Sequence, residues 1–368
     1  MRPVKLGFYA RLALILHAVI LILFIMYMAK TVLIPLFFAF LVAMLLYPVT
    51  SFLERRRFPR GIAAFLSVLI FIVIIGALVW FFSAQVISFS KDMPRLQTRF
   101  TELLNGIQDW FSRKYHIDDA HQRAYVNQSA EGMLSGVVNS IGTTFVGIVE
   151  FVILTIFFFI FTFFILVYRA LLVKFIRAFF ADDHSDKVNE VIFKTRTVTN
   201  SYLVGLMTEM LIMVVLNVSI LLVLGIKYAF LLGILAAVLN IIPYLGIYTA
   251  MAIGMLITLA NGTGTQALQF ALALVVVHFI DANIILPRIV GGRVKMNPLI
   301  TIIAVLIGRL VWGIPGMFLF IPLTAIIRII SARIDDMKPW AILIGDEKKG
   351  NGLVKTPPDP VDMPGAGG

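Results

Sequence analysis

The sequence predicts an all-α polytopic membrane protein, and three observations support this fold class. Of the 368 residues, 60% are apolar and only 14% are charged, whereas soluble proteins average about 25% charged residues. The apolar residues form continuous runs, and a helix needs about 20 such residues to cross a bilayer. The runs lack the strict alternation of an outer-membrane barrel. This composition excludes a cytosolic enzyme, a disordered chain and a small disulfide scaffold.

About eight hydrophobic segments follow one another along the chain. The first has no small-residue cleavage site before the next begins, so we interpret it as a retained helix and not as a signal peptide. The eight segments are Leu12–Ala29, Val32–Phe52, Ile62–Phe82, Phe145–Tyr168, Leu203–Ile226, Tyr228–Ala260, Ala267–Leu286 and Pro298–Ile330.

These segments divide the chain into regions with different expected roles. Between the third and fourth segments, apolar residues recur every three or four positions from Met93 to Lys114, which predicts an amphipathic helix outside the bilayer. We expect residues 1–82 to form N-terminal transmembrane helices that act as a scaffold, and residues 83–144 to form a small helical extracytoplasmic region. Residues 145–200 would form a fourth transmembrane helix and a cytoplasmic amphipathic helix. Residues 201–335 would form a transport core, and residues 336–368 a flexible cytoplasmic tail.

The distribution of Lys and Arg predicts the orientation of the chain. Most of these residues lie in the N-terminal segment, the turn Arg55–Arg60, the stretch 169–200, the loop 287–297 and the tail. Because cytoplasmic loops of membrane proteins are enriched in Lys and Arg, both termini are expected to be cytoplasmic. The net charge of +11 has the same explanation, so no nucleic-acid partner is expected.

Two segments of 33 residues, Tyr228–Ala260 and Pro298–Ile330, are too long for a single crossing. Each contains residues that interrupt a helix near its middle, because proline removes a backbone donor and glycine tolerates irregular backbone. The interrupting residues are Pro243 and Gly246 in the first segment, and Gly313, Pro315 and Gly316 in the second. Each segment is therefore predicted to form two short helices.

Two re-entrant hairpins would explain the charge distribution. If Pro298–Ile330 crossed once, the basic tail would lie outside the cell; a hairpin keeps it inside. The regions 201–262 and 265–335 would then form an inverted-topology repeat, in which broken helices meet near the membrane midplane as in secondary transporters. Two ordinary proline-kinked helix pairs in a packed bundle are the alternative.

Among the ionisable residues of the hydrophobic segments, the candidates for a functional role are Glu209, His278, Asp281 and Arg309. An ionisable group in hydrocarbon costs about 2.5–3.5 kcal/mol, so each requires a reason. Ion or proton coupling is one interpretation; an interfacial position for Glu209 and a structural Asp281–Arg309 pair are the alternatives.

The broken segments also supply neutral groups that could bind a small polyhydroxylated solute. Unwound backbone carbonyls and helix ends accept hydrogen bonds without a formal charge, although the same glycines could simply permit close helix packing. The candidate residues for substrate binding or gating are Asn240, Pro243, Tyr244, Gly246, Asp281, Asn283, Pro287, Gly313, Pro315 and Gly316.

An ordered set of motifs in the sequence resembles the autoinducer-2 exporter family of bacterial inner-membrane permeases, from about Thr31 to Ile330. The motifs are Leu46-Tyr47-Pro48, the basic turn Arg55–Arg60, Ile242–Gly246, Asp281–Gly291, Met296-Asn297-Pro298, Gly313–Gly316 and Ile321-Pro322-Leu323. The resemblance implies efflux of the quorum-sensing furanone autoinducer-2, while some members resemble sodium(lithium)/proton antiporters. At Arg309 the chain departs from the small or apolar residue that is usual in the family.

The sequence therefore predicts a multi-pass secondary transporter in the bacterial inner membrane that exports a small polar solute. No zinc-protease, Walker or dinucleotide motif is present, so neither an enzyme nor a cofactor or metal site is expected. A sodium(lithium)/proton antiporter and a non-transporting scaffold or regulator are the alternatives. The expected partners are the lipid bilayer, the solute, a sodium ion or proton, and further copies of the chain, because the first three helices form a separable block.

Overall fold

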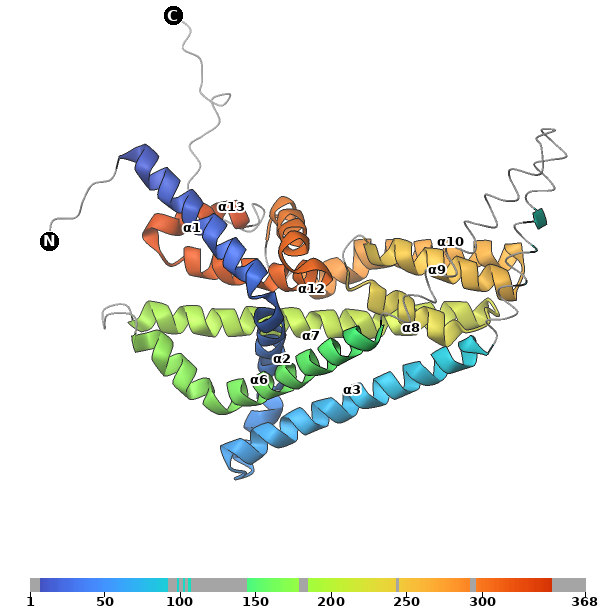
Figure 1. Ribbon diagram of the computed structural model, residues 1–368, viewed down its shortest axis with the longest axis horizontal. Coiled ribbons are helices and arrows are strands. Elements are labelled where there is room, and N and C mark those ends of the chain that lie inside the picture. Colours follow the sequence, from blue (N-terminus) through green and yellow to red (C-terminus); the bar gives the residue numbers. More distant parts are fainter. Residues whose placement is uncertain are drawn as a thin grey trace, which may run out of the picture.

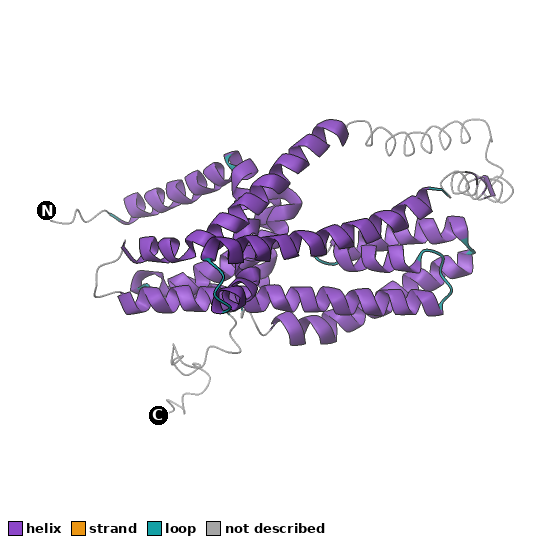
Figure 2. Cartoon of the chain, turned by 90° about the horizontal axis from the view of Figure 1, so that it is seen from below, coloured by secondary structure: helices purple, strands orange, loops and turns teal. Residues whose placement is uncertain are grey.

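The computed structural model describes residues 7–91, 98, 102, 105–106, 144–178, 185–242, 245–291 and 296–345. Within these residues the chain is almost entirely helical (Figure 2). In this described part of the chain, six helices are long and apolar enough to cross a membrane, and three shorter apolar helices accompany them. The fold class predicted from the sequence, an all-helical polytopic membrane protein, is confirmed at this level.

The elements follow the predicted hydrophobic segments in order. They are α1 (Phe8–Met28), α2 (Lys30–Arg55), α3 (Arg60–Ser90), α6 (Thr144–Ala178), α7 (Ser185–Val223), α8 (Ala229–Leu239), α9 (Leu245–Asn261), α10 (Gly264–Ile280), the π-helical turns η2 (Asp281–Ile285) and η3 (Pro287–Gly291), α12 (Pro298–Ser331), the 3₁₀ turn η4 (Asp335–Met337) and α13 (Lys338–Ile344).

Helices α6 and α7 extend well beyond the apolar runs that predicted them. α7 has 39 residues, about 58 Å at 1.5 Å per residue, whereas the hydrocarbon core is about 30 Å thick. The amphipathic segment expected before residue 200 is helical on both sides of residues 179–184, but it forms the end of α6 and the start of α7.

Helix α7 lies along the length of the molecule and joins two packed groups of helices (Figure 1). On one side it packs with α8, α9 and α10, where Leu221, Leu232, Phe270 and Leu274 form a buried cluster. On the other side it packs with α2 and α12, where Tyr202 and Trp312 belong to a second buried cluster. In Figure 1 the turns η2 and η3 connect these two groups, between α10 and α12.

The first helix break separates α8 from α9. α8 ends at Leu239 and α9 begins at Leu245, and the described residues between them, 240–242, form a turn and not a helix. Gly246 lies against the end of α8, since a Cβ atom at Gly246 would stand 1.9 Å from the Leu239 carbonyl oxygen. The chain therefore reverses between these helices, and only glycine fits at the point of contact.

The second helix break lies at Gly313, within α12. Its φ of 65° and ψ of −141° are not helical. A Cβ atom at Gly316 would lie 1.9 Å from the Gly308 carbonyl oxygen, although residues eight apart in a continuous helix are about 12 Å apart. The two arms of α12 are therefore folded back against each other, as the glycines and Pro315 predicted.

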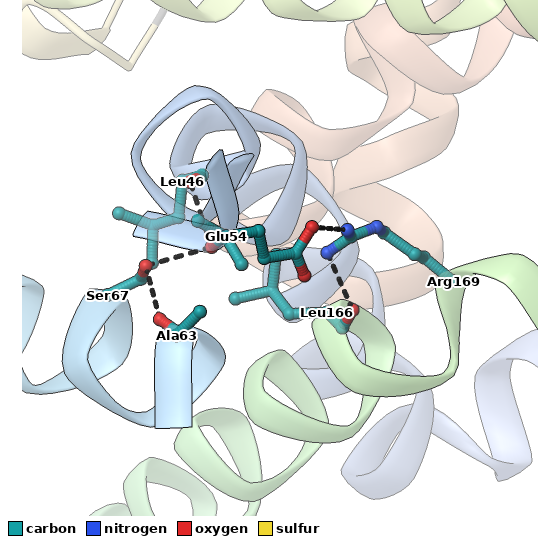
Figure 3. A network of polar contacts seen from close by, with 7 residues as sticks. Leu46, Glu54, Ala63, Ser67, Leu166 and Arg169 are labelled. Atoms are coloured by element: carbon teal, nitrogen blue, oxygen red, sulfur yellow. Dashed lines mark hydrogen bonds and ion pairs between the residues drawn. The ribbon is translucent and has the colours of Figure 1, made fainter. Parts of the chain in front are cut away.

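Helices α2, α3 and α6 form a third group, which contains buried polar contacts (Figure 3). The Thr50 hydroxyl donates to Ser67 Oγ at 2.9 Å, which in turn donates to the Ala63 carbonyl at 2.8 Å. Arg169 of α6 forms an ion pair with Glu54 of α2. Because apolar association between helices is weak in lipid, such polar bonds help to fix the register of the three helices.

Candidate functional site

Three residues predicted as site residues from separate segments meet in one cluster, which we call the carboxylate cluster. α7 supplies Glu209, the end of α8 supplies Asn240, and the start of η2 supplies Asp281. Asn240 Nδ2 donates to Asp281 Oδ2 at 2.9 Å and lies 3.4 Å from Glu209 Oε1. One amide thus bridges two acidic side chains that are far apart in the sequence.

Both acidic side chains of the carboxylate cluster are buried. Glu209 is 7% exposed and Asp281 is 2% exposed. Asp281 Oδ1 has no hydrogen-bond partner within the described part of the chain. Two carboxylates offer four acceptor oxygens, but one amide group has only two hydrogens to donate. The cluster therefore has acceptor capacity for a proton, a cation or the hydroxyl groups of a solute.

The helix break between α8 and α9 places Asn240 in this cluster. Asn240 is the C-terminal cap of α8, and the next residues lead into Pro243, which cannot donate a backbone hydrogen bond. The helix therefore stops at the level of Glu209 and Asp281, and a short amide side chain reaches both. Pro243 and Tyr244 themselves lie outside the described residues.

A change of helical pitch accompanies Asp281. The Leu286 amide donates to the Asp281 carbonyl, five residues back, so α10 continues as a π-helical turn. Pro287 explains this shift, because it has no amide to satisfy the carbonyl of Asn283 four residues earlier. Short π-helical turns occur frequently at functional sites. The sequence contained the signal, Pro287 after a buried Asp, but a π-helical turn was not predicted from it.

His278 lies next to the carboxylate cluster. It precedes Asp281 by three residues, and the two groups are close enough to interact electrostatically. Its Nδ1 atom is buried and has no hydrogen-bond partner within the described residues. His278 therefore lies on the same side of its helix as Asp281, in line with their three-residue spacing.

The alternative pairing of Asp281 with Arg309 is wrong. Arg309 is exposed on α12, and within the described residues the oxygens of Asp281 meet only Asn240. The reason is packing, because α12 contacts α1, α2, α7 and α13 while Asp281 lies at the end of α10. Glu209 is buried against Asn240.

Two other predicted site residues near Asp281 are not part of the cluster. Asn283 is exposed, and its Nδ2 donates to the Phe279 carbonyl of its own helix at 2.8 Å. Pro287 is also exposed and begins η3. Pro287 therefore affects the backbone geometry near Asp281 and does not itself contact the carboxylate cluster.

The second helix break is anchored on α1. Trp312, which precedes Gly313, is 4% exposed, and its Nε1 donates to the Met26 carbonyl at 2.8 Å. Met26 lies close to Ala29, where α1 ends before α2 begins. Such helix ends leave carbonyls without intrahelical partners, and the indole of Trp312 donates to one of them. Pro315 is half-buried and Gly316 is buried beside this contact.

Tyr202 lies near both the carboxylate cluster and the second arm of α12, although no polar pattern in the sequence marked it. Tyr202 lies two turns before Glu209 on α7 and is near enough to it for an electrostatic interaction. It is 4% exposed, and its ring centroid lies 6.5 Å from that of Phe318 on the second arm of α12. From the sequence alone, a tyrosine among apolar residues is assigned to the hydrophobic core. Its position near Glu209 is seen only in the folded structure.

Comparisons with known proteins agree on one family. The family model described as AI-2E family transporter matches residues 16–336. Two relatives carry the name "Putative transport protein": YrrI of Bacillus subtilis is 24% identical over 82% of this chain and 86% of its own length, and a protein of Haemophilus influenzae is 23% identical over 89% of this chain and 94% of its own length. The AI-2 transport protein TqsA of Escherichia coli is 21% identical, over 87% of this chain and 91% of its own length.

Proposed function

The chain belongs to the AI-2E family of transporters, and on that premise we propose that it moves a small polar solute across the bacterial inner membrane by secondary transport. The carboxylate cluster is the site that we assign to this function. Membership in a transporter family favours transport over catalysis, and over the scaffold or regulator that was the remaining alternative.

One observation carries the proposal. Glu209, Asn240 and Asp281 place two buried acidic groups and an amide at the point where a broken helix meets α7 and η2. Ionisable groups are costly in a membrane and are usually found on substrate or ion pathways. Discontinuous helices supply such sites in secondary transporters. A solute with several hydroxyl groups could donate to the acceptor oxygens that Asn240 leaves unpaired.

Autoinducer-2 is the solute that we propose, and export is the direction. The support is the similarity to TqsA, a protein named for AI-2 transport, together with the chemistry of the cluster. A small furanone with several hydroxyl groups fits a site made of hydrogen-bond acceptors and one amide donor.

A sodium(lithium)/proton antiporter is the second candidate function, and the paired carboxylates favour it. Glu209 and Asp281 share one amide, and no ion pair with Lys or Arg is formed by either acid within the described structure. Two buried acids without a Lys or Arg partner are suited to bind a cation or exchange protons. In this case they would carry the transported ion itself.

The arrangement in the membrane is part of the same proposal. We assign cytoplasmic positions to both termini and an inverted-topology repeat to residues 201–262 and 265–335, with the two helix breaks as re-entrant hairpins. The folded-back arms at Gly246 and at Gly308–Gly316 support this assignment. Helices α1–α3 would form the scaffold, and their largely exposed apolar surface leaves room for lipid and for further copies of the chain.

Flux into proteoliposomes tests the two functions. Wild-type protein is reconstituted, and uptake of autoinducer-2 and of sodium is measured with and without a proton gradient. Asp281→Asn keeps the shape of the side chain but removes its charge. We expect at least about a tenfold loss of flux, which corresponds to about 1.4 kcal/mol of lost stabilisation.

Asp335→Asn is the matched control, because it removes the same charge from an exposed residue of η4. Its flux should equal that of the wild type. Autoinducer-2 flux that persists in Asp281→Asn would refute the assignment of the site. Sodium flux alone, lost in the same variant, would identify the antiporter, and no flux of either solute from folded protein would favour the scaffold.

A further inference from the structure

A basic junction lies where α2, α6 and α7 meet, away from the carboxylate cluster. It consists of Tyr47, Glu54, Arg169 and Arg196. The guanidinium carbon of Arg196 lies 3.6 Å from the centroid of the Tyr47 ring, and that of Arg169 lies 5.1 Å from the same centroid. Two cations from two helices therefore converge on one aromatic ring.

The charges in the basic junction do not balance. Glu54 forms an ion pair with Arg169 (Figure 3), so the one carboxylate is already engaged. Arg196 is exposed and makes no ion pair with a carboxylate within the described residues. The neighbouring turn adds exposed basic groups at Arg55, Arg56 and Arg57. The surface around Arg196 is thus positive and lacks a counter-charge.

Exposed apolar side chains occur near the basic junction along the same three helices. Phe52 of α2, Leu171 of α6 and Phe193 of α7 are 57%, 59% and 67% exposed. Each lies within five residues of Tyr47, Arg169 or Arg196 on the same helix. A positive surface close to exposed apolar side chains matches the boundary between lipid tails and headgroups.

We propose that the basic junction binds the phosphodiester headgroup of an anionic phospholipid, with Arg196 as the main ligand. A planar guanidinium can donate two parallel hydrogen bonds to a phosphate, which an ammonium cannot do. Stacking on Tyr47 holds the Arg196 guanidinium in place before the lipid binds. Basic pockets between transmembrane helices bind such headgroups in other membrane proteins.

The test measures lipid retention and does not depend on transport. The full-length protein is purified from mixed micelles of phosphatidylglycerol and phosphatidylcholine, and native mass spectrometry gives the ratio of the two lipids bound. The wild type should retain phosphatidylglycerol preferentially. Arg196→Gln should lower this preference about fivefold, since a basic residue near an anionic surface contributes about 1 kcal/mol.

Lys194→Gln is the matched control, because it removes one positive charge from the same helix while Lys194 Nζ lies 2.7 Å from Glu190 and outside the junction. Its lipid preference should stay at the wild-type value. An equal loss in Lys194→Gln and Arg196→Gln would show bulk surface charge and overturn the proposal. Equal retention of both lipids by the wild type would also overturn it.

Two further measurements complete the test. If Arg196→Gln does not fold, Arg196→Lys is used instead, because lysine keeps the charge but lacks the planar guanidinium group. This variant should retain less phosphatidylglycerol than the wild type. Equal retention would overturn the proposal. Millimolar inorganic phosphate is added to protein in phosphatidylcholine nanodiscs. It should not raise the melting temperature, whereas a rise equal to that given by phosphatidylglycerol would indicate a free-phosphate site.

Discussion

At the residue scale, the absence of a Cβ atom at two glycines and the presence of one side-chain amide determine close contacts between helices. Gly308 and Gly316 allow the arms of α12 to meet backbone to backbone, and a Cβ atom at Gly308 would lie 2.2 Å from the Gly316 carbonyl oxygen. A Cβ atom there could not be accommodated by moving a side chain, because the opposing atom belongs to the main chain. Asn240 has a comparable role in the carboxylate cluster, where one amide is shared by two acids.

Gly308→Ala should destabilise the protein by about 1–3 kcal/mol, the usual cost of forcing extra volume into a packed interior. Gly264→Ala provides the control, since a Cβ atom at Gly264 meets nothing within 4 Å. Unfolding of both variants in detergent, followed by circular dichroism, gives the comparison. Equal stability of the two variants would contradict the close packing of the α12 arms.

Asn240→Ala should lower stability by about 1–3 kcal/mol, because it removes a donor from two buried acceptors. Asn261→Ala removes an amide that, among the described residues, bonds to the Ile257 carbonyl of its own helix at 3.0 Å, and it should cost much less. Thermal unfolding in detergent measures the difference. A harmless Asn240→Ala would mean that the two acids do not depend on this amide.

At the element scale, short polar contacts hold the ends and breaks of helices. Trp312 satisfies a carbonyl at the end of α1, and Thr50 and Ser67 join α2 to α3. The indole of Trp312 also packs on Phe37 and Phe320, with ring centroids 5.4 Å apart in both cases. The tip of the second broken helix is therefore fixed by both a hydrogen bond and aromatic packing.

Trp312→Phe should cost about 1–3 kcal/mol, because the ring is largely retained while the Met26 carbonyl loses its donor. Trp340→Phe, at a residue of α13 that is 56% exposed, makes the same chemical change without a buried partner. Thermal unfolding of the two variants in detergent separates the effects. If Trp340→Phe proved as costly, the contact with Met26 would not explain the result.

Thr50→Val and Ser67→Ala, alone and combined, form a double-mutant cycle across α2 and α3. The expected coupling energy is about 0.5–1.5 kcal/mol, the usual net contribution of one hydrogen bond. Denaturant unfolding of the four proteins measures it. Additive effects of the two substitutions would show that the 2.9 Å contact between the hydroxyl groups does not stabilise the helix pair.

The sequence allowed the helices and their breaks to be predicted, but not which residues of different helices come into contact. Both helix breaks were predictable, because Pro243 and Gly313 act on their own backbone. The position of Asp281 beside Asn240 was not, since helix packing brings together residues 41 apart in the sequence. The incorrect Asp281–Arg309 pair arose in the same way, from matching charges without knowing which helices are neighbours.

At the scale of the whole molecule, the expected inverted repeat makes a topological prediction. Because the chain has no cysteine, single cysteines can be introduced without further changes. Gly264→Cys lies at the start of α10 and Phe58→Cys lies in the exposed turn between α2 and α3. A membrane-impermeant thiol reagent added to intact cells should label the first and not the second. Labelling of both or of neither would contradict the two-hairpin topology.

Helix α7 has a thermodynamic consequence for the whole chain. It presents Glu209 to the first break and Tyr202, two turns away, to the second. We expect a ligand that favours one arrangement of the first break to change the free energy of the second through this helix, and linkage then requires the reverse effect to be equal in size. A substitution at Phe318 should therefore alter the affinity for a solute that it does not touch. The extent of that change would give the coupling free energy transmitted by a single helix.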